Sequence, residues 1–295
     1  MKPIKQTING GGQGKIRKYY SQKFKRTVVE KVLNIYSDNS GDEEILNAIN
    51  LYKEAIFLAG LNHPNIVKIY VLISDPPTII MEYCEYGSLR NILDKKILNP
   101  LYKIYLIYSI CNGLNYVHSK GIVHGDLKCD NILLSGEKIG NFPIPKLADF
   151  DLSQFDPNKV IGGAPGFIAP EVFESSGLNF KTDIFALGMI MFEILSGLKP
   201  LPSNPQLAIL FLQQKKIPCT KEILRKAWEL RIGELLPGIN NTYYDAFYTL
   251  MISFIDDDPE KRPSILVIFT IDKKLYKILL DAAEDLNNES NNSLY

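Results

Sequence analysis

The chain has 295 residues, of which 46% are hydrophobic and 22% charged, and its 33 basic residues balance its 33 acidic residues. This length suits one large domain or two small lobes, and the composition excludes a disordered chain, a collagen and a coiled coil. Because the formal net charge is zero, no global basic excess attracts the chain to nucleic acid, and we expect no nucleic-acid partner.

Targeting and membrane signals are absent from the sequence. The longest apolar run, residues 184–195, carries Glu193 and is shorter than the roughly 18–20 residues that cross a bilayer. We therefore expect no membrane span. The start of the chain lacks the apolar stretch and cleavage site of a signal peptide. The 4 cysteines are scattered without a C-x-x-C pair, which predicts reduced thiols in a cytoplasmic protein, without a disulfide framework or zinc site.

The first third of the chain has the pattern of β-strands. Short segments rich in β-branched and aromatic residues predict strands over residues 4–8, 15–19, 27–33, 66–73 and 78–82. The glycine cluster Gly10-Gly11-Gly12-Gln13-Gly14 predicts a hairpin turn between the first two strands. Apolar residues at helical spacing predict a helix over residues 43–61, which ends before Pro64.

After Gly87 the pattern becomes helical. Helices are predicted over residues 88–93, 101–119, 181–195 and 243–255. A strand-rich lobe followed by a helical lobe is an α+β arrangement, and clefts between such lobes are common ligand sites. The residues from 287 onward are too polar to pack and predict a frayed tail.

One segment concentrates acid, base and amide groups between apolar flanks: Ile122-Val123-His124-Gly125-Asp126-Leu127-Lys128-Cys129-Asp130-Asn131-Ile132-Leu133-Leu134. Asp126 can accept a proton from a hydroxyl, and Lys128 can steady a transferring phosphoryl group. Asn131 offers a carbonyl oxygen to a hard cation such as Mg²⁺, and Asp149 follows as a second oxygen ligand behind another apolar strand. The segment therefore predicts chemistry on nucleotide phosphates.

Two earlier features are ambiguous on their own. The glycine cluster could cradle phosphate oxygens with its backbone amides, or it could be a simple turn. Lys31, at the end of a strand filled with Val28, Val29 and Val32, could be an ordinary contact of an edge strand with solvent.

The order and spacing of these motifs resemble those of eukaryotic protein kinases over residues 4–283. Residues 8–16 resemble the glycine-rich loop, Val28-Val29-Glu30-Lys31 resembles the lysine motif of the third strand, and Glu54 falls where the helix-C glutamate lies. Residues 124–131 resemble the catalytic loop, and Asp149-Phe150-Asp151 resembles the magnesium motif.

Three further motifs extend the resemblance toward the end of the chain. Ala169-Pro170-Glu171 resembles the end of the activation segment, and residues 183–188 look like the start of the central helix of the large lobe. Arg262 stands where a kinase arginine pairs with the glutamate of that first motif.

The resemblance implies a two-lobed protein-kinase-like fold of the α+β class. A small N-lobe with an antiparallel sheet and one main helix would occupy residues 1–82, followed by a hinge over 82–87. A larger helical C-lobe would occupy residues 88–283, and residues 284–295 would form a polar disordered tail. Since little chain lies outside this domain, we expect no second folded domain, and regulation by the lobes themselves or by a separate protein partner.

The resemblance also implies an enzyme that transfers the γ-phosphate of ATP to Ser or Thr hydroxyls of a protein substrate, with Mg²⁺ as cofactor. The catalytic residues would be Asp126, Lys128, Lys31 and Glu54. The nucleotide would contact Ile8, Asn9, Gly10, Gly11, Gly12, Gly14, Ile16, Val29, Lys31, Met81, Glu82, Cys84 and Leu133. The magnesium ligands would be Asn131 and Asp149.

Two departures from the kinase pattern concern activation. Gly125 stands where kinases that are activated by phosphorylation have the arginine that receives the activation-loop phosphate. Ser153 is the only residue with a hydroxyl side chain in the segment 149–171. Because both the acceptor of the phosphate and most of its attachment sites are missing, we expect activity that does not depend on phosphorylation of this loop.

Other departures support an alternative function. Asn9 replaces the first glycine of the loop, a mild change. Asp151 replaces the glycine of the magnesium motif, and Ala164 replaces a threonine that bridges the catalytic aspartate and lysine in Ser/Thr kinases. With Gly125, these changes also fit a pseudokinase that binds a nucleotide or a partner without transferring phosphate. The presence of all six catalytic and metal residues favours an active kinase.

Overall fold

The structure is a computed structural model that describes residues 6–11, 14–32, 55, 59–95, 98–150, 166–174, 177–199 and 241–267. The chain divides into two compact units, Met1–Tyr86 and Gly87–Tyr295. The first unit contains a sheet of five strands. The four α-helices whose bounds the structure describes all lie in the second unit. This separation of strands and helices confirms the predicted α+β fold class.

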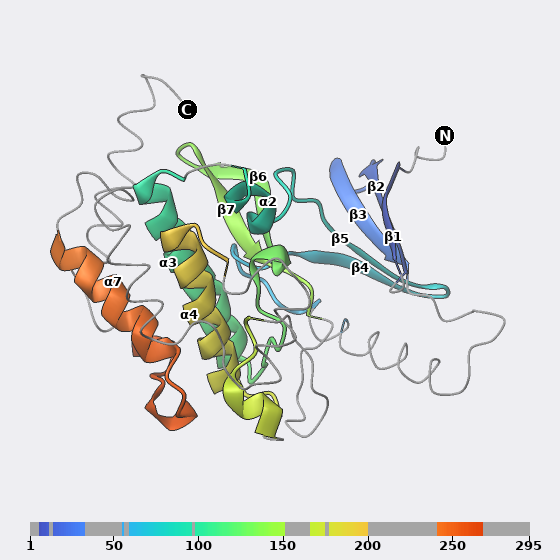
Figure 1. The fold of residues 1–295 in the computed structure, drawn as a ribbon. Helices are drawn as coiled ribbons and strands as arrows, with labels where there is room; N and C mark the ends of the chain where they lie inside the picture. The colour runs from blue at the N-terminus through green and yellow to red at the C-terminus, as the bar shows by residue number, and fades with distance from the viewer. Residues whose placement is uncertain are drawn as a thin grey trace. The chain divides into compact units, whose positions relative to one another are not determined.

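The first unit is built around an antiparallel sheet with the strand order β1-β2-β3-β5-β4 (Figure 1). The strands are β1 (Gln6–Gly11), β2 (Gly14–Ser21), β3 (Arg26–Val32), β4 (Ile69–Ser74) and β5 (Pro77–Glu82). Gly11 and Gly14 are paired across β1 and β2, so these strands form the hairpin that the glycine cluster predicted.

Two predicted elements of the first unit differ from the structure or extend beyond its described residues. The strand predicted from residue 66 begins at Ile69 instead, because a turn at His63 precedes it: the Ile66 N–H donates to the His63 carbonyl at 3.1 Å. The helix predicted over residues 43–61 lies largely outside the described residues. Within it, Ala55 is helical, and its carbonyl accepts a hydrogen bond from the Ala59 N–H at 2.9 Å.

The second unit contains four described α-helices, α2 (Leu89–Leu93), α3 (Pro100–Ser119), α4 (Phe180–Ser196) and α7 (Asn241–Phe254), and the 3-10 turns η1 (Cys129–Asn131), η2 (Pro170–Glu174) and η3 (Pro259–Lys261). Capping side chains define where α2 and α4 begin. Ser88 and Asn91 form a capping box at α2, and Asn179 and Thr182 form another at α4. No helix within the described parts of the chain has the length and hydrophobicity of a membrane span.

Helix α4 lies between α3 and α7 (Figure 1). Every residue from Thr182 to Ser196 is buried, as expected for a helix that is apolar on nearly all sides. Gly188 allows α7 to approach closely. A Cβ added to Gly188 would lie 2.6 Å from Ile255 Cγ2 and 2.9 Å from Phe254 Cβ.

Replacing Gly188 by alanine is expected to lower the free energy of unfolding by about 1–3 kcal/mol, because the added methyl group must push α7 away from α4. Urea unfolding measures this change. Thr249→Ala is the matched control, because Thr249 lies on the exposed side of α7. A Gly188→Ala protein as stable as this control would contradict the close approach.

The sequence did not predict one hairpin of the second unit. β6 (Ile132–Ile139) pairs antiparallel with β7 (Phe142–Leu147), and only the end of β7, before Asp149, was expected as a strand. Pro143 and Pro145 obscure β7, because proline cannot donate to a strand ladder and is rare in strands other than edge strands. A sheet of two strands has only edge strands, so both prolines are tolerated.

Candidate active site

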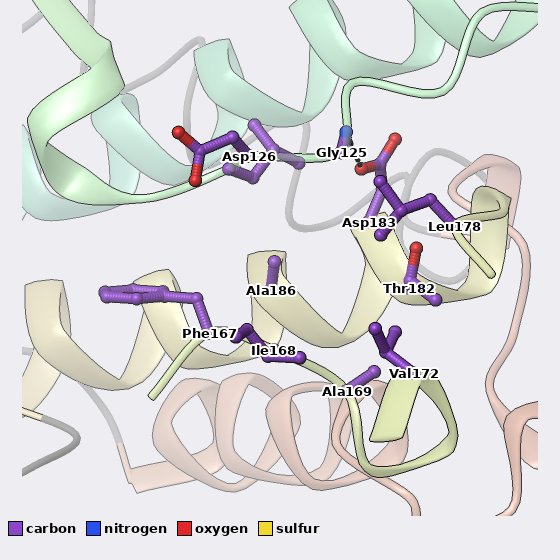
Figure 2. Close-up of a pocket in the computed structure, with 11 residues that line it drawn as sticks. Gly125, Asp126, Phe167, Ile168, Ala169, Val172, Leu178, Thr182, Asp183 and Ala186 are labelled. Atoms are coloured by element: carbon purple, nitrogen blue, oxygen red, sulfur yellow. Dashed lines mark hydrogen bonds between the residues drawn. The ribbon is translucent and has the colours of Figure 1, made fainter. Parts of the chain in front are cut away.

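The backbone of the catalytic loop is fixed by one carboxylate of α4. Asp183 Oδ2 accepts the His124 N–H at 2.8 Å, and Asp183 Oδ1 accepts the Gly125 N–H at 2.9 Å (Figure 2). The His118 Nε2 atom of α3 lies 2.8 Å from Asp183 Oδ2. Gly125 has a φ of 79°, a left-handed conformation that glycine adopts without strain. The loop therefore enters the site in a conformation set by α3 and α4.

Three of the predicted site residues meet in this loop. Lys128 Nζ donates to Asp126 Oδ2 at 2.6 Å, and Asn131 Nδ2 donates to the same oxygen at 2.9 Å. Asn131 Nδ2 also donates to the Asp126 carbonyl at 2.8 Å. The other carboxylate oxygen, Asp126 Oδ1, is buried and has no hydrogen-bond partner among the described residues. An unpaired buried oxygen is costly in free energy, and functional sites are where such atoms are often kept.

The predicted metal ligands come from neighbouring segments. The Ala148 N–H donates to the Asn131 carbonyl at 2.9 Å, and Asp149 is the next residue of the chain. Because the amide nitrogen of Asn131 is held by Asp126, its amide oxygen is the atom left for a ligand. Asp149 is exposed and has a φ of 60°. An amide oxygen and a carboxylate fit Mg²⁺, which prefers oxygen ligands together with phosphates and water.

His124 supports the loop from within the core. It is fully buried, its Nε2 lies 3.2 Å from the Ala148 carbonyl oxygen, and its ring centroid lies 4.4 Å from that of Phe150. Burial lowers the pKa of His124, although Asp183, Asp126 and Asp149 act in the opposite direction. A neutral histidine with a ring contact to Phe150 serves packing and loop orientation.

A pocket lies beside the catalytic loop (Figure 2). Its lining is apolar apart from Asp126, Thr182 and Asp183. The residues that form it come from the catalytic loop, from the segment that leads into η2 and from α4, and include Gly125, Asp126, Phe167, Ile168, Thr182 and Ala186. The carboxylate of the loop therefore borders a small hollow to whose surface polar and apolar atoms contribute about equally.

In the first unit, the sheet register places four predicted nucleotide contacts on one face. Ile16 pairs with Lys31 across β2 and β3, and Val29 pairs with Met81 across β3 and β5. Because side chains alternate along a strand, Ile16, Lys31, Val29 and Met81 share a face. All four are partly exposed, whereas Val28 and Glu30, which alternate with Val29 and Lys31 along β3, are buried.

The other predicted nucleotide contacts lie at the end of β5, just after it, in β6 and in the β1–β2 hairpin. Glu82, at the end of β5, is buried, and its Oε2 accepts the Lys68 N–H at 3.2 Å. Cys84 is also buried, and Leu133 is the second residue of β6. Backbone positions in the β1–β2 hairpin are described for Ile8, Asn9, Gly10, Gly11 and Gly14. Several predicted residues lie outside the described ranges, and their roles stay predictions: Gly12, Glu54, Asp151, Ser153 and Ala164.

Arg262 and Glu171 form the predicted ion pair. Arg262 NH1 and NH2 donate to the two carboxylate oxygens of Glu171 at 2.5 and 2.7 Å. Arg262 also donates to the Asp256 and Lys181 carbonyls, so η3, α4 and η2 meet at this guanidinium. This pair holds the segment that forms one wall of the pocket.

Two groups around the site were not predicted. The first is Asp183, which accepts hydrogen bonds from the loop amides. The second is the ion pair between Arg90 of α2 and Glu193 of α4, in which Arg90 NH2 donates to both carboxylate oxygens at 2.8 and 2.7 Å. The sequence did indicate that Glu193 needs a partner, because it is the single charged residue of the apolar run 184–195 and a buried charge must be paired.

Comparison with known proteins identifies the fold. Residues 3–272 match the family model described as protein kinase domain. The protein named "Putative serine/threonine-protein kinase R436" of Acanthamoeba polyphaga mimivirus is 33% identical over 282 residues, which cover 88% of this chain and 90% of that protein.

Two cellular relatives are longer than this chain. The serine/threonine-protein kinase RUNKEL of Arabidopsis thaliana is 34% identical over 199 residues, or 64% of this chain and 14% of that protein. The ovarian-specific serine/threonine-protein kinase Lok of Drosophila melanogaster is 28% identical over 277 residues, or 89% of this chain and 54% of that protein. Because the family model covers most of the chain, including the sheet, the catalytic loop and α4, the chain belongs to the protein kinase family.

Proposed function

We propose that this chain transfers the γ-phosphate of ATP to Ser and Thr hydroxyls of a protein substrate, and that it does so without phosphorylation of its activation loop. The observation that carries the proposal is the state of Asp126. Lys128 and Asn131 hold one of its carboxylate oxygens, and the other is buried without a partner among the described residues. A fixed carboxylate with one oxygen left to accept is what a hydroxyl nucleophile needs.

In the proposed reaction, the hydroxyl oxygen of the substrate bonds to the γ-phosphorus, and the bond from this phosphorus to the bridging β–γ oxygen breaks. ADP leaves, and the hydroxyl proton passes to Asp126 Oδ1. Lys128, beside Asp126, offsets the negative charge of the transferring group. Asn131 and Asp149 would hold Mg²⁺, which would neutralise part of the phosphate charge when bound.

The rest of the nucleotide would be bound by the first unit. Lys31, oriented by Glu54, would hold the α- and β-phosphates, and the face formed by Ile16, Val29 and Met81 would cover the adenine. The partial exposure of that face supports this role, because a ligand must reach it.

A polypeptide substrate is favoured by the relatives, which are named as protein kinases. Specificity for Ser and Thr is supported by Lys128 in the catalytic loop and by the three relatives named as serine/threonine-protein kinases.

The test is transfer of labelled γ-phosphate from ATP to a generic protein substrate, followed by analysis of the phosphorylated amino acids. We expect phosphoserine and phosphothreonine in the presence of Mg²⁺, and no transfer when EDTA removes the metal. Phosphotyrosine alone would overturn the Ser/Thr specificity. No transfer with either Mg²⁺ or Mn²⁺ would overturn the enzymatic function and favour the pseudokinase.

Replacing Ser153 by alanine is expected to leave most of the transfer rate intact, because Gly125 provides no cation to bind a phosphate on this loop. The rates of the variant and of phosphatase-treated wild type should both match that of untreated wild type. Loss of most of the rate in either sample would show that loop phosphorylation is required.

The location of the protein in the cell and its regulation are also proposed. The scattered cysteines support a reducing, cytoplasmic location. A separate protein partner is proposed as the source of regulation, since the proposed mechanism leaves no phosphorylation switch in the activation loop.

A further inference from the structure

Arg90 of α2 joins three elements of the second unit. Its NH2 group donates to both oxygens of Glu193 in the last turn of α4, at 2.8 and 2.7 Å. Its Nε lies 3.5 Å from Asp130 Oδ2 in η1. Arg90 therefore lies between a buried carboxylate of the core and the turn that ends in Asn131.

The pair with Glu193 fixes the guanidinium. The Glu193 side chain is 1% exposed and that of Arg90 is 14% exposed, so neither charge is well hydrated. Burial raises the pKa of Glu193, and its hydrogen bond to Arg90 acts in the opposite direction. A buried carboxylate that loses a cation such as Arg90 is left with a large unfavourable free energy, so this contact links α2 firmly to α4.

The second contact, to Asp130, gains from the first. Asp130 is 53% exposed, and an isolated surface ion pair of this kind contributes little, mainly because two long side chains must be ordered. Here Arg90 is already held by Glu193, so the entropic cost of the pair with Asp130 is small. The pair can therefore define where η1 lies.

A neighbouring contact ties the same turn to the same pair. Cys129, the first residue of η1, is fully buried, and its thiol forms a hydrogen bond with the Glu193 carboxylate. Cys129 and Asp130 are thus attached to Glu193 and Arg90, and the next residue is Asn131, whose amide nitrogen bonds to Asp126. A shift of η1 would move Asn131 and disturb its contact with Asp126.

We propose that Arg90 is a positioning residue for Asn131 and, through it, for the binding of the metal–nucleotide complex. The inference rests on the proposed function, in which Asn131 is a magnesium ligand. It assigns no contact between Arg90 and the substrate.

The test separates positioning from stability. Arg90→Met alone leaves Glu193 buried and unpaired and is expected to destabilise the fold. The double variant Arg90→Met, Glu193→Met replaces the pair with apolar side chains and is expected to regain most of the unfolding free energy. In the double variant, binding of Mn²⁺·ADP, measured by electron paramagnetic resonance of Mn²⁺, is expected to be about tenfold weaker than in wild type. Arg90→Lys should recover part of this affinity.

Lys199→Met is the matched control. Lys199 Nζ lies 3.1 Å from Asp94 Oδ1 at the end of α2, and both side chains are well exposed. Removing this pair changes the charge near the same helix without touching η1, so Mn²⁺·ADP affinity should be unchanged. A double variant that is as stable as wild type and binds Mn²⁺·ADP equally well would overturn the inference, because Arg90 would then serve folding alone.

The measurement also distinguishes this inference from the proposed function. Binding of Mn²⁺·ADP requires no phosphate transfer. A wild-type chain that binds Mn²⁺·ADP and transfers no phosphate would overturn the proposed function, while the affinities of the variants would still decide the role of Arg90. A wild-type chain that binds no Mn²⁺·ADP would overturn both.

Discussion

Replacement of Asp126 by asparagine is expected to lower the rate of phosphate transfer by about 10²–10⁴-fold, the usual contribution of a positioned general base. Asparagine has the same size and can still accept a hydrogen bond from Lys128 or Asn131. It cannot take up the hydroxyl proton at neutral pH, so the loop should keep its shape and lose its acceptor. The rate of transfer from labelled ATP at saturating nucleotide measures the loss.

Two further measurements make this result specific. The affinity for Mg²⁺·ATP should change little, because Asp126 is expected to contact the substrate hydroxyl and not the nucleotide. Asp257→Asn removes an exposed carboxylate of the second unit and should keep the full rate. An Asp126→Asn protein that transfers phosphate as fast as this control would show that another group accepts the proton.

Replacement of Arg262 by methionine is expected to lower the free energy of unfolding by about 3–5 kcal/mol, the usual effect of breaking a buried ion pair from one side. The Arg262 side chain is 0% exposed and that of Glu171 is 8% exposed, so the remaining carboxylate has little access to bulk water. The change also removes hydrogen bonds to the Asp256 and Lys181 carbonyls. Urea unfolding monitored by circular dichroism measures the loss.

The neighbouring Lys261 offers the matched control. Its pair with Asp258 has an N–O distance of 3.5 Å, and the two side chains are 69% and 47% exposed, so Lys261→Met should cost less than about 1 kcal/mol. The double variant Arg262→Met, Glu171→Met should be more stable than Arg262→Met, since it removes the unpaired charge. If Arg262→Met and Lys261→Met lowered the free energy of unfolding equally, burial would not be what makes the Arg262–Glu171 pair important for stability.

The helices were predictable from the sequence because local chemistry defines them. Ser88 and Asn179 are N-caps, and the predicted starts of α2 and α4 lie within one residue of the observed ones. The β6–β7 hairpin was not predicted, because Pro143 and Pro145 have the opposite local preference and are tolerated only through the two-stranded geometry. Local preference therefore predicted the helices and failed where tertiary pairing decides.

The same distinction holds for the site. The chemistry of the segment around Asp126 was predictable from the sequence, because its acid, base and amide groups are close together in the chain. The bonds from Asp183 to the loop amides join residues nearly sixty positions apart and require knowledge of the fold. Arg90 and Glu193 are still farther apart, so the sequence could indicate only that Glu193 needs a partner.

The convergence of three polar groups on Asp183 bears on how the catalytic loop exchanges its amide hydrogens with solvent. The His124 and Gly125 amide hydrogens can exchange only when their bonds to Asp183 open. Asp183 is buried in the first turn of α4, which packs against both α3 and α7, so solvent has little access to its carboxylate. We therefore expect hydrogen exchange at these two amides to be slower than at exposed loop amides of the second unit.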